Sequence, residues 1–513
     1  MSDQTSDERI YDIAVIGGGV NGCGIARDAV GRGLSVYLCE KGDIGGATSS
    51  WSTKLFHGGL RYLEYYEFRL VREALIEREA LLTAMPHISW PLRFVLPHHK
   101  ELRPWWLIRM GLFLYDNLAP RSFLRGTDNL DLTRHEAGRP LKKGMFRKGF
   151  EYSDGWVQDS RLTVLNARDA ATRGATIRRG TKATEAKREG DVWVVTTEDV
   201  ETGSVATVRA KALVNAGGPW VRKIIDDALH VETADKVRLV RGSHIITRKM
   251  FDHDKAYIFQ SGDNRVIFAI PYEGDFTLIG TTDRDHKASP DQIAIEADEI
   301  DYLLGEVARY FENPPTRDDI VATYSGVRPL YDDGASSATA ATRDYVLKVE
   351  GEGAEAPLLN VFGGKITTYR RLAESAVEKL RGYFPQAGEA WTRGVAMPGG
   401  DFPVQGRADL AEGLRRDYPF LDDKWAMRLV THYGTDARRI LGAASRAEDL
   451  GRRFGHDLTE AEVRFLMDAE WARSAEDVLW RRTKLGLRLT SEQAAALDGW
   501  MRDRRAERLQ AAE

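Results

Sequence analysis

Three glycines near the N-terminus, Gly17, Gly19 and Gly22, have the spacing G-x-G-x-x-G, with Asn21 between the last two. Gly17 permits a tight turn, Gly19 lets the backbone approach a pyrophosphate, and Gly22 lets a helix pack closely on a strand. The first turn of that helix would offer free N–H groups to phosphate oxygens. Glu40 ends the next apolar run, where its carboxylate can accept hydrogen bonds from ribose hydroxyls. Because an acidic residue there disfavours a 2′-phosphate, the loop predicts NAD or FAD rather than NADP.

Two later glycine turns help to choose between these dinucleotides. Residues 212–220 are an apolar run that ends in a glycine pair beginning at Gly217. A second turn, Gly363 and Gly364, opens a helical segment that begins near Thr367. Backbone N–H groups at such a helix start can stabilise negative charge on a reduced flavin ring. A chain that returns to its cofactor three times from distant positions is typical of an FAD enzyme, so we predict FAD.

These turns need a sheet behind them. Residues 13–16 and 34–38 are short apolar runs on either side of a helical segment, 20–32, which is the pattern strand, turn, helix, strand. Further helices are expected at 68–84 and 159–173. Short β-branched runs, divided by Gly, Asp and Asn, predict an antiparallel sheet inserted after the parallel one; they are 192–197, 208–215, 237–247, 257–260, 266–270 and 276–281.

From about Gly406 to the end, Ala, Arg, Leu and Glu dominate and strand signals disappear, which predicts a separate helical domain. The predicted fold class is α/β, a Rossmann-like FAD-binding domain with an inserted antiparallel-sheet substrate domain and an all-α C-terminal domain. We divide the chain into an FAD-binding domain (1–75, 151–235 and 351–400), a partly helical insertion (76–150), a substrate domain (236–350) and a C-terminal domain (401–513).

Length and composition set the class of protein. A chain of 513 residues is too long for one ordinary core. Its formal net charge of −4 provides no field that would attract nucleic acid, and we expect no nucleic-acid partner. Two cysteines, Cys23 and Cys39, are too few for a disulfide framework, which favours a reducing compartment. We expect neither a signal peptide nor a metal site.

Residues 104–118 (PWWLIRMGLFLYDNL) are the most apolar stretch of the chain. They are fewer than the ~18 residues that a membrane-spanning helix needs, and Arg109 and Asp116 interrupt them. A helix buried in a core is the interpretation that we favour. The alternative is a monotopic membrane contact, because Trp rings and flanking arginines suit the headgroup region.

Six longer segments give the chain a family resemblance over nearly its full length. It resembles the aerobic, FAD-dependent glycerol-3-phosphate dehydrogenases of bacteria. The segments are 47–50 (ATSS), 54–63 (KLFHGGLRYL), 149–154 (GFEYSD), 242–245 (GSHI), 324–330 (YSGVRPL) and 342–345 (TRDY).

The resemblance implies oxidation of sn-glycerol 3-phosphate to dihydroxyacetone phosphate by hydride transfer to flavin N5, with electrons passed to a membrane quinone, ubiquinone or menaquinone. It also implies a cytoplasmic protein, commonly a homodimer, attached peripherally to the lipid surface of the inner membrane. One alternative is a glycerol-3-phosphate oxidase that reduces oxygen to peroxide. An amine or amino-acid oxidase of the same superfamily and a non-catalytic flavoprotein are further alternatives.

The substrate's phosphate calls for guanidinium groups, whose forked donors match phosphate oxygens. In similar enzymes the arginines that correspond to Arg328 and Arg343 lie in the substrate pocket. Arg61 and Tyr62, just after the turn at His57, are further candidates for substrate contact. Without the resemblance, a surface ion pair is the ordinary interpretation of any single arginine.

Oxidation of an alcohol also needs a group that takes the hydroxyl proton. A neutral imidazole titrates in the right range, and we choose His244 first, although a histidine on a strand is more often a core residue. His57 and Lys365 are alternatives, and Lys365 could instead hold a substrate oxygen or polarise the flavin. The hydroxyls of Thr48, Ser49 and Ser50 suit the edge of a flavin ring, although a helix cap uses the same residues.

Overall fold

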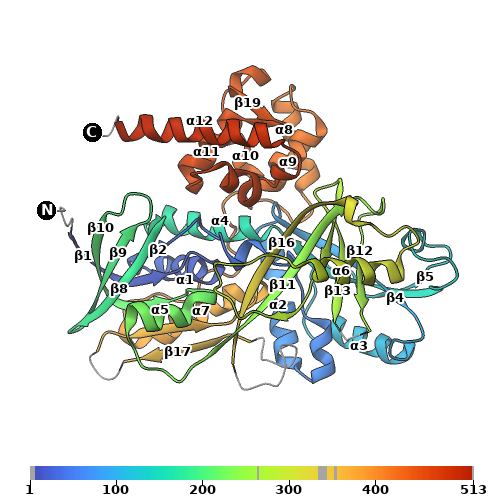
Figure 1. The fold of residues 1–513 in the computed structure, drawn as a ribbon, viewed down its shortest axis with the longest axis horizontal. Coiled ribbons are helices and arrows are strands. Elements are labelled where there is room, and N and C mark those ends of the chain that lie inside the picture. The colour runs from blue at the N-terminus through green and yellow to red at the C-terminus, as the bar shows by residue number, and fades with distance from the viewer. Residues whose placement is uncertain (1–5, 263–264, 333–343, 352–354, 511–513) are drawn as a thin grey trace.

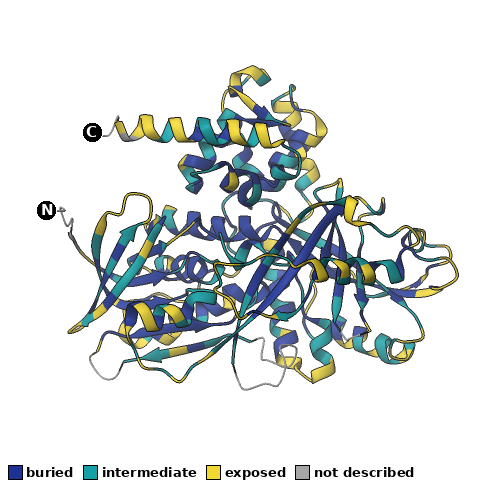
Figure 2. Cartoon of the chain, viewed as in Figure 1, coloured by how far each residue is buried: buried dark blue, intermediate teal, exposed yellow. Residues whose placement is uncertain are grey.

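The computed structural model describes residues 6–262, 265–332, 344–351 and 355–510. Figure 1 shows three parts: a sheet with helices on the left, a second sheet on the right, and a mainly helical part above both. Figure 2 shows that the strands and helices where these parts meet are the most buried of the molecule.

The first sheet has the strand order β17-β18-β10-β1-β2-β7, and all its neighbours are parallel except β17 and β18. The expected pattern of strand, turn, helix and strand is confirmed by β1 (Ser6–Ile16), α1 (Val20–Gly31) and β2 (Val36–Glu40). The other strands are β7 (Thr176–Arg179), β10 (Val205–Asn215), β17 (Val346–Glu350) and β18 (Leu358–Phe362), and the hairpin β8 (Thr181–Glu189) and β9 (Val192–Asp199) extends the sheet from β10.

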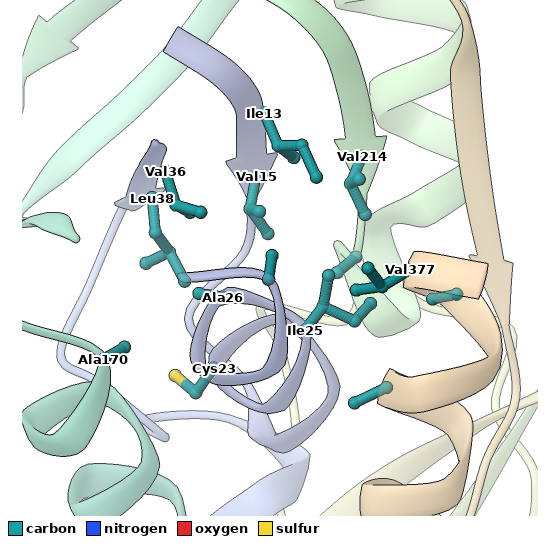
Figure 3. Close-up of a cluster of buried hydrophobic side chains, with 14 of the residues drawn as sticks. Ile13, Val15, Cys23, Ile25, Ala26, Val36, Leu38, Ala170, Val214 and Val377 are labelled. Carbon is teal, nitrogen blue, oxygen red and sulfur yellow. The ribbon is translucent and has the colours of Figure 1, made fainter. Parts of the chain in front are cut away.

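Helix α1 lies against the centre of this sheet and packs between α4 (Asp159–Thr172) and α7 (Tyr369–Leu380). Ile25 of α1 is fully buried, and Figure 3 shows it pointing toward Val214 of β10 and Val377 of α7, which are distant from it in the sequence. Close approach depends on small residues. A Cβ on Gly22 would lie 1.9 Å from the carbonyl oxygen of Gly17, so the turn and the helix could not both keep their positions.

The second sheet has the strand order β15-β11-β14-β13-β12-β4-β6-β3, with β16 paired to β11 and β5 to β6. Helix α6 (Ala297–Tyr310) packs on β11 and β13. The strands are β3 (Leu55–Phe56), β4 (Ser89–His98), β5 (Asp128–Asp131), β6 (Lys148–Val157), β11 (Val237–Arg248), β12 (Ala256–Gln260), β13 (Val266–Tyr272), β14 (Phe276–Gly280), β15 (Arg284–Asp285) and β16 (Ile320–Tyr331).

Two strand expectations are wrong. Residues 192–197 and 208–215 belong to the first sheet, because β10 pairs in parallel with β1 and carries β9 on its other end. A buried parallel strand and a sandwich strand have the same short apolar sequence, so periodicity could not separate them. The second sheet instead takes β4 and β6 from residues that we expected in the helical insertion and the FAD-binding domain. The domain division remains a proposal.

The C-terminal part contains α8 (Arg407–Asp417), α9 (Asp423–Tyr433), α10 (Ala437–Leu441), α11 (Glu460–Glu470) and α12 (Ser491–Gln510). It also contains a small hairpin, β19 (Arg453–Gly455) and β20 (Leu458–Thr459), which is too short for a strand pattern and was not expected. Buried ion pairs attach it to the FAD-binding half: Arg482 donates to Asp43 at 2.8 and 2.9 Å. Because both charges are buried, removing either one would leave the other unpaired.

Helix α3 (Trp105–Asn117) corrects the expectation of a core helix at residues 104–118. It lies near the lower right of Figure 1, together with the start of α2 (Phe68–Ala84) on the side away from the C-terminal part. Only Leu112 and Tyr115 are buried, whereas Trp106 is 66% and Phe113 56% exposed. No helix among the described residues is long and apolar enough to cross a membrane.

Candidate functional site

A cavity of about 1760 Å³ begins at the carboxyl ends of the first sheet and reaches the second sheet. Ligands of open α/β sheets bind at this edge. Short helix α5 (Val221–Ile224) begins just after the cavity wall at Trp220. Of the residues singled out in the sequence, the cavity is lined by Gly17, Gly19, Asn21, Glu40, Thr48, Ser49, His57, Arg61, Tyr62, Gly217, Arg328, Gly363, Gly364 and Lys365.

The three glycine turns meet at one end of this cavity. A Cβ on Gly17 would lie 2.5 Å from the carbonyl oxygen of Ala216, next to Gly217. Asn21 Nδ2 donates to the carbonyl oxygen of Gly363 at 3.2 Å, while its Oδ1 is buried without a hydrogen-bond partner among the described residues. An unpaired buried acceptor on a cavity wall is typical of a ligand site. Backbone N–H groups and this amide therefore form a cradle that fits a dinucleotide.

Glu40 is fixed at the same end. Its Oε2 accepts from the Gly18 N–H at 2.7 Å, and its Oε1 accepts from the Gly42 N–H at 2.8 Å. Burial raises the pKa of Glu40, although these two N–H groups work in the opposite direction. Each carboxylate oxygen has a second lone pair that can accept from a ribose hydroxyl.

The hydroxyls of residues 48–50 make hydrogen bonds within the protein, and their contact with the flavin stays a prediction. Thr48 Oγ1 donates to the Val327 carbonyl at 2.7 Å, and Ser49 Oγ accepts from the Val20 N–H at 2.9 Å. Ser50 is fully buried and does not line the cavity. These hydrogen bonds hold the loop between α1 and β16, and Thr48 and Ser49 both line the cavity.

Two further cofactor candidates lie behind the wall. Gly22 is buried under the glycine turn, and Thr367 is 1% exposed, where its Oγ1 accepts from the His57 N–H at 3.3 Å. Thr367 therefore joins the 3-10 turn at Ile366–Thr368 to the segment that begins at His57. Neither residue lines the cavity.

Cationic side chains also line the cavity, and one of them, Lys365, directly follows the glycine turn Gly363–Gly364. Arg61 lies on the 3-10 helix Leu60–Tyr65, and its Nε is buried without a partner among the described residues. A buried guanidinium N–H that lacks an acceptor is a ready site for an anion. The ammonium of Lys365 lies 3.9 Å from the ring centre of Tyr62, a cation–π distance. Arg61, Tyr62 and Lys365 thus face one space.

Arg328 reaches the same cavity from β16. It forms an ion pair with Asp283, and its Nη2 donates to Thr281 Oγ1 at 3.2 Å. A Cβ on Gly242 would lie only 2.4 Å from Nη2, so the glycine makes room for the guanidinium. Because Asp283 neutralises Arg328, a phosphate dianion would also need the charge of Arg61 or Lys365. Arg343 lies outside the described residues.

His244 is less accessible than we expected of a base. It is 1% exposed, stacks on Tyr324 at 4.6 Å and does not line the cavity. Its Nε2 is 3.0 Å from Thr53 Oγ1, and Thr53 does line the cavity; its Nδ1 has no partner among the described residues. Burial, with Arg328 and Lys54 nearby, holds the pKa of His244 well below its usual range. The imidazole is therefore neutral at pH 7 and reaches the cavity through Thr53. His57 and Lys365 line it directly.

Sequence reasoning missed several side chains of the wall. Thr53, Asp154 and Asp283 line the cavity, and none was given a role. The sequence did contain a signal for Asp154, because this residue ends the segment 149–154 that carries part of the resemblance. Asp283 lies between β14 and β15 without any pattern of its own, and the pairing of β15 and of β16 with β11 brings it to Arg328.

Comparisons with known proteins agree with this geometry. Residues 12–370 match the family described as FAD dependent oxidoreductase, and residues 390–502 match the C-terminal domain of alpha-glycerophosphate oxidase. The chain belongs to the FAD-dependent oxidoreductase family, and its cofactor is FAD.

Among individual proteins, the chain is 49% identical to the aerobic glycerol-3-phosphate dehydrogenase of Escherichia coli over 97% of this chain and 98% of the relative. It is 51% identical to the D-erythritol 1-phosphate dehydrogenase of Brucella abortus over 95% and 97%. The FAD complex of the glycerol-3-phosphate dehydrogenase from Bacillus halodurans shares the fold, with a TM-score of 0.76 and 23% identity over 97% and 94% of the chains. The predicted fold class, including the C-terminal domain, is confirmed.

Proposed function

We propose that this enzyme oxidises sn-glycerol 3-phosphate to dihydroxyacetone phosphate and passes the electrons to a membrane quinone. The observation that carries the proposal is the 49% identity, over 97% of the chain, to a relative named for this substrate. The cavity supports it, because cationic groups from β16 and the helix Leu60–Tyr65 lie beyond the glycine end of a dinucleotide cradle.

Arg328, Arg61 and Lys365 are proposed to hold the phosphate. The forked donors of Arg328 and the unpaired Nε of Arg61 can each reach a different oxygen, and Lys365 adds a point charge. Arg343 is proposed as a fourth group on the resemblance alone. Fixed at this end, the substrate would present its C2 carbon toward the glycine end of the cavity.

FAD, when bound, would supply the two-electron acceptor for the hydride that leaves C2 of the substrate. The chain must accept the hydroxyl proton at the same time. We propose that this proton passes to Thr53 Oγ while the Thr53 proton passes to His244 Nε2, 3.0 Å away. The low pKa of His244 keeps its imidazole neutral, and Nε2 is the acceptor in the tautomer that carries the hydrogen on Nδ1. His57 and Lys365 are the alternative acceptors, because both line the cavity.

Peripheral attachment to the inner membrane is proposed for α3. Its exposed Trp106, Met110 and Phe113 form an apolar face, and Tyr66, which precedes α2, and Phe68, which begins it, are also exposed. Aromatic side chains suit the headgroup region of a bilayer, from which a quinone would also arrive. A homodimer is proposed on the resemblance alone.

A second candidate substrate is D-erythritol 1-phosphate. The Brucella relative named for it is 51% identical, marginally more than the Escherichia relative. Both compounds carry a secondary alcohol next to a phosphorylated carbon, and they differ by one CHOH group. Identity alone does not separate two substrates this similar, so they must be compared directly.

The test measures kcat/KM for both phosphates with an artificial electron acceptor under anaerobic conditions. We expect glycerol 3-phosphate to be preferred by at least about tenfold. A preference of that size for D-erythritol 1-phosphate would replace the proposed substrate. Measuring peroxide formation against ubiquinone reduction then tests the acceptor: mostly peroxide would make the chain an oxidase.

A further inference from the structure

Asp154 on β6 is a buried carboxylate of the cavity wall that the proposed reaction does not use. Its Oδ1 accepts three hydrogen bonds: from Arg78 Nη1 at 2.6 Å, from Tyr115 OH at 2.6 Å and from the Gly58 N–H at 3.3 Å. These donors come from α2, from α3 and from the segment that leads to Arg61. Asp154 therefore fixes the base of that segment through one oxygen.

The second oxygen of Asp154 is different. Oδ2 accepts no hydrogen bond from any residue that the structure describes, although the side chain is only 4% exposed. Burial raises the pKa of Asp154, even though Arg78, Tyr115 and Gly58 stabilise the charged form. Oδ2 is not among the fully buried side-chain atoms that lack a partner, and Asp154 lines the cavity, so Oδ2 is an acceptor open to a donor on a ligand there.

The chemistry of that ligand follows from charge. An anionic acceptor repels a phosphate, so the phosphate must lie with Arg328 and Lys365 rather than beside Asp154. In a polyol phosphate the group that meets Oδ2 is therefore a hydroxyl, the only kind of donor that such a substrate carries. Phe94 and Tyr152, stacked at 5.5 Å on β4 and β6, line the same cavity and make the surroundings apolar, which strengthens a hydrogen bond to a hydroxyl.

We propose that Asp154 Oδ2 accepts a hydrogen bond from the substrate hydroxyl on the carbon beyond the one that is oxidised, and that it selects phosphorylated polyols. This inference rests on the proposed function. In glycerol 3-phosphate the group is the C1 hydroxyl; in a four-carbon polyol phosphate it is the hydroxyl of the carbon next to the reacting one. A phosphate that ends in a methyl group leaves Oδ2 unpaired in the complex and is a poor substrate.

Glu151 provides the matched control. It lies three residues earlier on β6, is buried, and pairs with Arg93 at 2.6 Å as Asp154 pairs with Arg78. Glu151 does not line the cavity. A general effect of removing a buried charge from β6 should therefore appear in both positions, whereas substrate selection should depend on Asp154 alone.

The experiment uses the wild-type holoenzyme with two compounds: sn-glycerol 3-phosphate and the matching enantiomer of propane-1,2-diol 1-phosphate, which lacks only the terminal hydroxyl. We expect kcat/KM to be on the order of 100-fold or more lower for the second compound, because a site built to bind a hydroxyl rejects an analogue that lacks it. A ratio within about threefold overturns the inference. If neither compound reduces the flavin, the proposed function itself fails.

Two variants then assign the effect. Asp154→Asn should reduce the ratio between the two compounds by about tenfold or more, through a loss on glycerol 3-phosphate, while Glu151→Gln keeps the wild-type ratio. An Asp154→Asn enzyme that binds FAD and keeps the full ratio overturns the assignment. If that variant does not bind FAD, the wild-type ratio still decides whether the terminal hydroxyl is recognised.

Discussion

The two ends of the cavity are built in different ways. The glycine end consists mainly of backbone from three turns. It is so tightly packed that a Cβ added to Gly22 would lie 1.9 Å from the carbonyl oxygen of Gly17. The second-sheet end consists of side chains, among them Arg61, Asp154 and Arg328, which come from three separate elements. The glycine end depends on residues that have no side chain, whereas the second-sheet end depends on the charged and polar groups of its side chains.

Because of this difference, we expect substitutions at one end to impair the function of that end and leave the other intact. Changes at the glycine end should remove the cofactor, because they displace the backbone that receives it. Changes at the second-sheet end should leave FAD in place and alter the turnover or binding of the substrate. Each of the following experiments tests whether cofactor binding and substrate turnover depend on different ends of the cavity.

The largest effect is expected from Gly22→Val. The added side chain must displace the Gly17 turn or helix α1, so the purified protein should contain less than about a tenth of the wild-type flavin. Flavin absorbance per protein measures this. Gly305→Ala is the control, because a Cβ there meets nothing within 4 Å. Normal flavin content in the valine variant would contradict the tight turn.

Next is His244→Gln, which removes the proposed proton acceptor at the second-sheet end. We expect kcat of this variant to fall by about 100-fold with its flavin content unchanged. If Thr53 connects His244 to the substrate, kcat of Thr53→Val should fall by a similar factor. Thr53→Ser keeps the hydroxyl and should stay within about threefold. If Thr53→Val retains wild-type kcat, the proton does not pass through Thr53, and His57 or Lys365 becomes the acceptor to test.

Arg328→Lys should have a smaller effect. The variant keeps the charge beside Asp283 but loses the fork, so KM for glycerol 3-phosphate should rise by about 10- to 50-fold with FAD still bound. Steady-state kinetics at saturating acceptor measure it. Arg317→Lys, at an exposed pair with Asp301, is the control. Loss of flavin from Arg328→Lys would show that the two ends are not independent.

Trp106→Ser on α3 should affect neither end. Removing this exposed ring should weaken binding to vesicles that contain anionic lipid by about tenfold, measured by co-sedimentation. Activity with a soluble acceptor should remain at the wild-type value. Unchanged vesicle binding would remove α3 from the proposed membrane contact.

The smallest effect concerns stability against pH. The pKa of His244 is lower in the folded protein than its usual 6.5, so below pH 6.5 the unfolded chain binds more protons and wild-type stability decreases. His244→Gln lacks this loss. When the pH falls from 7 to 5.5, the wild-type protein should therefore lose about 1 kcal/mol more unfolding free energy than His244→Gln does. His230→Asn, at an exposed position, should show no such shift; an equal shift there would contradict the assignment.

The two ends also differ in how far sequence could predict them. The glycine turns were found because each is a local pattern with a backbone task, and Gly17, Gly217 and Gly363 do meet. The second-sheet end is assembled by long-range pairing, such as β11 with β16 and β4 with β6, which no local pattern encodes. For this reason the burial of His244, the pairing of Arg328 with Asp283 and the position of Asp154 were not predicted. For α3 the sequence favoured a core helix over the alternative of a surface contact, because an apolar helix on a surface and one in a core have the same composition.

The most direct test of the account is anaerobic mixing of the wild-type holoenzyme with one equivalent of sn-glycerol 3-phosphate while the flavin absorbance is recorded. The account predicts that the oxidised flavin bleaches and that dihydroxyacetone phosphate appears in equal amount. Flavin that remains oxidised in excess glycerol 3-phosphate, in protein with full FAD content, would contradict it.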